Sequence, residues 1–412
     1  MIKRVVYLLL ILFLCYSCFN VNKISLYNLS ALYSTTMFTE LKVSAFNIDR
    51  ETVRIHVPIE VTDMIIDQDE ENARSYRKFE ISYELFETYE SKQILDSASF
   101  VIVDSSLSIA DTNFQFEINY PGHEEYVLKL SLTDLNRIDA VTTYLHFDNR
   151  SDNTRNSYLL KDEHGDLMYS TSVSSQNYIG LQVNEDGIDK LIVRYYKREF
   201  PLALPPFMEE PNQSFEYKAD SVFNVHVTDK TTPFIDLSEE GFYHFQKDSN
   251  QREGYTIFRF YDGFPEISTS EQMLMPLRYI TSRNEFAELT QAKDSKLSVD
   301  NFWLKNAGNP TRARSMIQKF YSRVVDANVF FTSYHEGWKT DRGLVYIVYG
   351  PPKIVYRGDG IEEWLYGEKG NSNSIRFQFL KVVNPFTDND YSLVKSPSFK
   401  EKWYNIVNTW RR

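Results

Sequence analysis

The chain has 412 residues and a formal net charge of −12, from 45 Lys and Arg against 57 Asp and Glu. Its length allows two to four domains, each with a core of its own, and its acidic charge opposes binding to nucleic acid. With 29 Phe and 28 Tyr but only 15 Gly and 14 Pro, the composition is typical of a globular, strand-rich protein rather than a disordered one.

Residues 1–17 predict a signal peptide. A basic pair precedes the apolar run 5–14, which is too short to span a bilayer comfortably. The following LCYSC resembles a bacterial lipoprotein signal, in which Cys18 becomes the first residue and carries lipid on its thiol and amino group. Cys15 fits less well because a bulky Leu precedes it. An uncleaved anchor helix and plain signal cleavage are the alternatives.

The anchor is expected in the outer membrane. Phe19 stands where an Asp would favour retention at the inner membrane, and residues 19–23 lack the acidic cluster associated with export to the cell surface. The body is therefore expected to face the periplasm, with residues 18–39 as tether and entry segment. Several acyl chains would make the attachment permanent, since each buried CH₂ contributes about 0.8 kcal/mol. The chain has no other cysteines, which excludes a disulfide framework, a cysteine metal site and a thiol nucleophile.

Residues 40–150 predict a β-sandwich of immunoglobulin-like shape. Short strands alternate apolar and polar residues and are separated by polar turns, with no convincing helix between them. The clearest strands lie at 79–87, 97–104, 114–120, 126–132 and 142–147. The chain has no Cys…Trp…Cys pattern, so this topology rests on the strand spacing alone.

Residues 151–267 predict a second β-rich domain. Its clearest strands lie at 178–183, 190–196, 221–227, 241–246 and 255–261. Between two of them, the Pro-rich stretch 200–211 is expected to be an exposed loop that lies against its own domain. A contact surface for something else is the alternative.

Residues 268–412 predict an α+β domain, because the apolar period changes to that of a helix. Helices are expected at 269–294, 311–330 and 398–410, and strands at 344–349, 362–366 and 375–380. Pro276 would sit in the first turns of the first helix or kink it. The fold class is thus multidomain, with two β-rich regions followed by helices packed on a small antiparallel sheet.

The most unusual stretch is HEGWKTDRGLVYIVYGPPK, residues 335–353. Gly337 and Gly343 are expected to adopt backbone conformations that a Cβ resists, and Trp338 to anchor the corner by burying its ring. Thr340 and Asp341 are expected to accept hydrogen bonds from backbone N–H groups.

The residues after this corner predict an ion pair and a buried strand. Arg342 is expected to bind a carboxylate, with Asp341 or Glu363 as candidate partner. Residues 344–349 are apolar on both faces, which is typical of a central strand, and the prolines that follow would end it.

A catalytic site is the alternative interpretation of this stretch. His335, Glu336, Asp341, Glu362 and Glu363 could make an acid–base set. However, the sequence lacks the second histidine of a zinc-binding helix, a G-x-S-x-G elbow and a Gly-rich phosphate loop. A structural corner is therefore favoured, with no catalytic residue, metal or cofactor.

The same stretch, with FW at 302–303, YSRVVDAN at 321–328 and EEWLY at 362–366, resembles the GWxTD domain of bacterial proteins, many of them from the Bacteroidetes. Gly337, Trp338, Thr340 and Asp341 match the motif that names the family, and Arg342 and Gly343 continue it. The resemblance covers roughly 270–412 and implies a lipoprotein or secreted protein with β-rich N-terminal regions. It implies no reaction, because the family has none established.

Two short sequences resemble the O-glycosylation sequon of the same lineage. DSA at 96–98 would place a glycan on Ser97, and DSV at 220–222 on Ser221. Three-residue motifs also occur by chance, and both lie at strand-like positions.

Two classes of function follow. The first is a lipid-anchored, non-catalytic scaffold or accessory subunit of an outer-membrane assembly for secretion, gliding or barrel insertion, with outer-membrane or secretion-system proteins as partners. It predicts a buried Trp338, an Arg342 paired with a carboxylate, and an exposed apolar patch elsewhere. The alternative is a hydrolase or glycan-binding protein acting on envelope polymers through carboxylates such as Asp341, Glu362 and Glu363. It predicts a cleft where carboxylates converge beside Trp338.

Overall fold

A computed structural model describes residues 24–411 except 26, 34–40, 60–63, 69–74, 106–111, 121–124, 138, 149–152, 174–177, 210–214, 359 and 372. The signal peptide, Cys15 and Cys18 lie outside these residues. In the part of the chain that is described, no helix is both long and apolar enough to cross a membrane.

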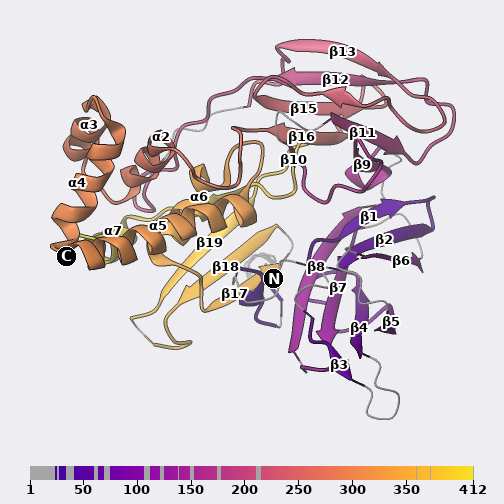
Figure 1. Cartoon of the computed structure of the whole chain (residues 1–412), viewed down its shortest axis with the longest axis horizontal. Coiled ribbons are helices and arrows are strands. Elements are labelled where there is room, and N and C mark those ends of the chain that lie inside the picture. Colours follow the sequence, from indigo (N-terminus) through magenta and orange to yellow (C-terminus); the bar gives the residue numbers. More distant parts are fainter. Residues whose placement is uncertain are drawn as a thin grey trace, which may run out of the picture.

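The N-terminal region forms two antiparallel sheets around one core (Figure 1). One sheet has the order β1-β2-β6. In the other, β4 pairs with β3, β5 and β7, and β7 pairs with β8. The strands are β1 (Ser44–Asn47), β2 (Thr52–Ile59), β3 (Asp67–Gln68), β4 (Ser75–Phe86), β5 (Asp96–Asp104), β6 (Thr112–Asn119), β7 (Glu125–Asp134) and β8 (Asp139–Asp148).

Alternation builds this core. Alternate residues of β2 and β4 are apolar and buried, from Val53 to Ile59 in β2 and from Phe79 to Leu85 in β4. Successive side chains of a strand point to opposite faces, so one face of each sheet is apolar and the two faces pack together. The expected β-rich architecture is confirmed.

The second β-rich region contains a sheet of order β10-β16-β15-β12-β13 and a smaller one of order β14-β11-β9. All pairings are antiparallel except β10 with β16. The 3₁₀ turn η3 (Arg155–Ser157) precedes it. The strands are β9 (Tyr158–Asp162), β10 (Ser172–Val173), β11 (Tyr178–Val183), β12 (Lys190–Tyr196), β13 (Ser221–His226), β14 (Ile235–Asp236), β15 (Gly241–Gln246) and β16 (Tyr255–Arg259).

The C-terminal region packs helices on an antiparallel sheet of order β17-β18-β19-β20 (Figure 1). The strands are β17 (Ile354–Gly358), β18 (Ile361–Tyr366), β19 (Ile375–Lys381) and β20 (Tyr391–Leu393). The α-helices are α2 (Ser270–Leu274), α3 (Arg283–Gln291), α4 (Ser295–Ala307), α5 (Pro310–Phe331), α6 (Asp341–Tyr349) and α7 (Lys400–Thr409). The 3₁₀ turns are η4 (Met275–Tyr279), η5 (Gly337–Lys339) and η6 (Pro397–Phe399).

Two expectations for this region are wrong. Residues 344–349 belong to helix α6, not to a central strand. A short, wholly apolar run fits a buried helix as well as a buried strand, and here Thr340 caps a helix. The single helix expected at 269–294 is divided into α2, η4 and α3, because Pro276 tightens the chain and Ser282 caps a new helix.

The described part of the N-terminal segment is bound to the C-terminal sheet. Ile24 bridges Gly358 in antiparallel fashion, and the Leu29 N–H donates to Val355 O at 2.8 Å. The 3₁₀ turn η1 (Ser30–Tyr33) follows and buries Tyr33 in the C-terminal core. Residues near the start of the chain therefore complete the free edge of β17.

The Pro-rich stretch also joins regions. Leu202, Ala203 and Phe207 pack on the C-terminal core, rather than on the stretch's own domain as expected. The Ala203 N–H donates to Lys339 O at 3.1 Å, and Ser396 N–H donates to Pro206 O at 2.9 Å. The contact surface left open as the alternative is thus used within the chain.

Candidate functional site

The motif begins with a tight turn packed against α5. Trp338 is 6% exposed, its backbone N–H donates to Asn328 Oδ1 at 3.2 Å, and its carbonyl accepts from Tyr279 Oη at 2.9 Å. Thr332 Oγ1 accepts from the Gly337 N–H at 3.1 Å. Trp338 therefore anchors the corner, as expected from its size.

The two glycines allow neighbouring main-chain segments to pack closely, and they do not adopt an unusual backbone angle. Neither Gly337 nor Gly343 has a positive φ. A Cβ on Gly337 would overlap the Ala327 carbonyl of α5, and one on Gly343 would overlap the Gly337 carbonyl. The expected backbone conformations are thus not the reason for glycine; contact between main chains is.

Thr340 and Asp341 hold backbone N–H groups, as expected. Thr340 Oγ1 accepts from Gly343 N–H at 2.9 Å and so caps α6. Asp341 Oδ2 accepts from Leu393 N–H of β20 at 2.7 Å. Lys395 lies 3.5 Å from Asp341 Oδ1. Together they fix the start of α6 and join it to the sheet.

The far end of α6 is satisfied by long side chains from two other helices. Arg323 of α5 donates to Ile347 O at 3.0 Å and to Val348 O at 3.2 Å. Trp410, just after α7, donates to Val348 O at 3.0 Å. A buried helix end needs such partners because its last carbonyls have none within the helix. The motif helix is thus capped at both ends.

Beneath α6, Glu362 of β18 lies in a buried ion cluster. Its carboxylate accepts from Arg357 Nε at 2.6 Å, Tyr33 Oη at 2.8 Å and Trp364 Nε1 at 2.7 Å. Arg342 Nη1 lies 3.5 Å away. Glu362 is 0% and Arg342 1% exposed, so each charge depends on the others.

Neighbouring positive charges and burial shift the pKa of Glu362 in opposite directions. Burial alone would raise the pKa of Glu362, but Arg357, Arg342 and the hydrogen bond from Tyr33 together hold it below its ordinary value. Burial raises the pKa of Tyr33, which therefore stays neutral and donates. The cluster is a charged, fully bonded core.

The carboxylate that Arg342 faces is neither of the two expected, Asp341 or Glu363. Arg342 faces Glu362, whereas Glu363 points to the opposite side of β18 and lies 3.5 Å from Arg376. Neighbouring residues of a strand face opposite ways. Arg342 also donates to Asn389 O at 2.9 Å.

Each candidate acid–base carboxylate is paired with a different basic side chain or backbone N–H group, so the carboxylates do not converge on one site. Glu336 pairs with Lys339 at 2.8 Å, and Asp341, Glu362 and Glu363 have the separate partners already described. His335 lies against Phe200 and Tyr334, and burial lowers its pKa to about 3. The structure brings Glu362, Arg342, Arg357 and Tyr33 together. Of these, the sequence did not single out Arg357 and Tyr33.

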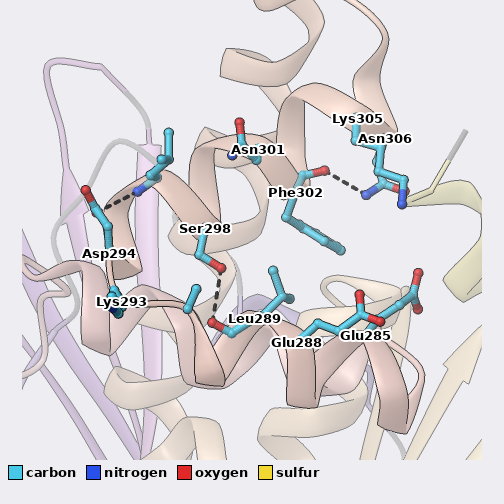
Figure 2. Close-up of a pocket in the computed structure, with 12 residues that line it drawn as sticks. Glu285, Glu288, Leu289, Lys293, Asp294, Ser298, Asn301, Phe302, Lys305 and Asn306 are labelled. Carbon is cyan, nitrogen blue, oxygen red and sulfur yellow. Dashed lines mark hydrogen bonds between the residues drawn. The ribbon is translucent and has the colours of Figure 1, made fainter.

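A hollow lies between α3 and α4, away from the motif. It measures about 440 Å³. Figure 2 shows Leu289 and Phe302 at its centre, Glu285 and Glu288 on α3, and Lys305 on α4. Glu285 is paired with Arg411. A smaller hollow of about 240 Å³ lies beside β12 and β15.

The two candidate glycosylation serines lie on edge strands. Ser97 is exposed on β5, and Ser221 is exposed at the start of β13. Each strand pairs with one neighbour among the described residues, β5 with β4 and β13 with β12.

A family model described as the GWxTD domain matches residues 241–412. The match begins at β15, before the change to helical period at 268. No curated protein matches the chain.

Proposed function

Residues 241–412 form a GWxTD domain, and we propose that the chain that carries it is a lipid-anchored, non-catalytic scaffold of an outer-membrane assembly. One observation carries this proposal: the polar side chains of the motif form hydrogen bonds and ion pairs with other residues of the fold. Thr340 caps a helix, Asp341 holds β20, and Arg342 is buried against Glu362. Side chains bonded in this way stabilise a rigid domain, and a partner would then bind to other, exposed surfaces of the chain.

Two exposed edges are the surfaces that a partner could use. On β5, Val101 and Val103 are exposed, and on β13, Val222 and Phe223 are exposed. Exposed apolar side chains on an edge strand are a common route by which another chain adds a strand. We propose outer-membrane or secretion-system proteins as the partners.

The anchor is proposed at Cys18, with the body facing the periplasm. The described chain begins at Ile24, which already pairs with β17. A fully extended chain advances about 3.5 Å per residue, so lipid on Cys18 would hold the GWxTD domain within about 20 Å of the membrane surface. A scaffold fixed in this way would meet membrane partners in one orientation.

The anchor is tested by substitution in the native host. Cys18→Ala should abolish labelling by a radioactive fatty acid and leave residues 1–17 attached, because lipid on the cysteine precedes that cleavage. Cys15→Ala is the matched control and should change neither. A native protein that is unlabelled and keeps residues 1–17 would overturn the lipid anchor and favour an uncleaved helix.

The scaffold is tested by affinity purification from detergent-solubilised native membranes with identification by mass spectrometry. Stoichiometric recovery of a barrel or secretion subunit is expected. Val222→Lys or Val101→Lys should abolish recovery if the corresponding edge binds, whereas Val329→Lys, at an exposed position of α5, should not. Recovery of the protein alone would contradict the scaffold and favour the envelope hydrolase or glycan-binding alternative.

Glycosylation at Ser97 or Ser221 is also proposed. It would decide whether the edge strand β5 or β13 is available to a partner. A glycan on β5 or β13 would prevent strand addition there. The intact mass of the protein purified from its host, compared with Ser97→Ala and Ser221→Ala, would reveal each glycan. An unmodified mass would remove both sites from the proposal.

A further inference from the structure

The smaller hollow lies where the second β-rich region meets the loop between β19 and β20. Its volume is about 240 Å³, and its wall includes Arg194 and Tyr196 of β12, Tyr217, and Phe386 of the loop. Residues 249–252 close one side. Ligand sites occur preferentially at such junctions between domains.

Arg194 is oriented by hydrogen bonds that leave some of its guanidinium N–H donors without an acceptor among the described residues. Its Nε donates to Gln246 Oε1 at 2.7 Å, and Gln246 in turn donates to Gln251 O at 2.6 Å. A long contact of 3.5 Å joins Nη2 to Ser249 O. The remaining N–H donors of Arg194 have no acceptor among the described residues. An arginine oriented by an amide, with donors to spare, is suited to bind a carboxylate.

A second arginine stands over an aromatic wall. The Arg252 guanidinium lies 4.7 Å from the centre of the Tyr217 ring. Tyr217 stacks with Phe386, with ring centres 6.0 Å apart and planes 26° apart. No described carboxylate lies within ion-pair distance of Arg194 or Arg252. The hollow thus presents two cations beside Tyr217, which is exposed and is backed by the buried ring of Phe386.

The rest of the wall is polar but uncharged. His244 contacts Thr256 Oγ1 and Arg252 O, and burial lowers its pKa to about 4, so it is neutral. Ser249, Asn250 and Gln251 bring hydroxyl and amide groups to the rim. In a chain whose formal charge is −12, a hollow lined by two arginines and no carboxylate selects for an anion.

We propose that this hollow binds an acidic sugar residue, with its carboxylate on Arg194 and Arg252 and its ring against the exposed side chain of Tyr217. Drug-sized ligands occupy about 300–1,000 Å³, so the hollow suits a single ring. The hydroxyl and amide groups of residues 249–251 suit sugar hydroxyls, which both donate and accept. This site is independent of the proposed scaffold and uses none of the motif residues.

The test uses the full-length protein and three probes: D-glucuronate, D-glucose and N-acetylphenylalanine, the last as a mimic of a peptide terminus. Binding is followed by saturation-transfer NMR and by titration calorimetry at millimolar probe. D-Glucuronate should bind, D-glucose should bind at least about tenfold more weakly, and N-acetylphenylalanine should be weaker than D-glucuronate.

Variants locate the site. Arg194→Gln and Arg252→Gln should each weaken D-glucuronate binding about tenfold; Arg252 is exposed, so its replacement leaves folding intact. Arg198→Gln is the matched control, because Arg198 also lies near the Tyr196 ring but is paired with Asp220. Equal binding of glucose and glucuronate, preference for N-acetylphenylalanine, no binding of any probe, or an equal loss in Arg198→Gln would each overturn the proposal.

Discussion

Trp338 is the residue by which the motif can be judged. Its ring is buried and its backbone is bonded to α5 and to η4, so Trp338→Ala leaves a cavity in the core. We expect a loss of about 3–5 kcal/mol in the free energy of unfolding, measured by urea denaturation. Tyr178→Ala, at an exposed ring, is the control and should change stability by less than about 0.5 kcal/mol. Full stability with lost function in Trp338→Ala would show that the corner is functional rather than structural.

Glu362 and Glu363 offer a comparison between adjacent carboxylates. Glu362→Gln leaves Arg342 and Arg357 buried with too little negative charge, and we expect a cost of about 3–5 kcal/mol. Glu363 pairs with Arg376, whose side chain is largely exposed, so Glu363→Gln should cost less than about 1 kcal/mol. Equal costs by chemical denaturation would contradict the buried network.

The buried cluster around Glu362 should make the free energy of unfolding sensitive to acid. The folded-state pKa of Glu362 lies below its ordinary value of 4.5, so the stabilisation is fully present above pH 4.5 and is lost as the pH falls through the folded-state pKa. Unfolding free energies measured from pH 7 to pH 3 should therefore fall more steeply for the native protein than for Glu362→Gln. Parallel curves would mean that this carboxylate does not contribute to acid lability.

At the scale of elements, the sequence predicted what depends on local pattern. The strands named for both β-rich regions were found close to their bounds, and so was α5, whose apolar stripe includes Phe320, Val324 and Ala327. β2 also alternates apolar and polar residues but was not among the expected strands. The motif roles of Trp338, Thr340 and Asp341 were also predicted, because size and capping chemistry are properties of the residues themselves.

What was missed depends on tertiary contacts. α6 is apolar all round because it is enclosed by α5, α7 and the sheet, and periodicity cannot separate such a helix from a strand. α4 was not predicted because its apolar residues do not form a clear stripe. Tyr33 joins Glu362 across more than three hundred residues, and no local signal marks such a pairing. Arg357 stands directly across from Glu362 on β17, but the sequence predicted no strand at 354–358.

The N-terminal segment should protect specific amides of β17. Val355 N–H donates to Asn28 Oδ1 at 2.9 Å, and Arg357 N–H donates to Ser25 Oγ at 3.1 Å. A chain that begins at Leu41 should therefore show faster hydrogen exchange at these two amides than one that begins at Ile24. Asn28→Ala should affect Val355 alone.

Amides of β19 are the internal control, because this strand lies between β18 and β20. Unchanged exchange at Val355 and Arg357 would show that the segment does not bind the edge in solution. Faster exchange in β19 as well would instead mean that the whole sheet depends on it.

At the scale of the molecule, the regions are joined by more than their linkers. Leu202 and Phe207 reach from the second β-rich region onto the C-terminal core. The Phe207 ring contacts Tyr404 in a tilted arrangement, and Arg155 pairs with Asp388 at 3.0 Å. Apolar contacts of this kind couple the unfolding of neighbouring regions, whereas one partly exposed ion pair contributes little. The rigid body that a scaffold needs would then depend on the stretch 200–207.

Replacing both Leu202 and Phe207 with Ser should uncouple these regions. We expect the native protein to unfold these two regions in one calorimetric transition, and the double variant to show separate transitions for the second β-rich region and the C-terminal region of helices and sheet β17-β18-β19-β20. Met208→Ser is the control, because Met208 lies in the same stretch with its side chain exposed; it should preserve the single transition. If the double variant also unfolded in one step, the buried cluster that packs Phe386 on Tyr196 and Phe242 would be the remaining coupling, and Phe386→Ser in the double variant would then have to separate the transitions.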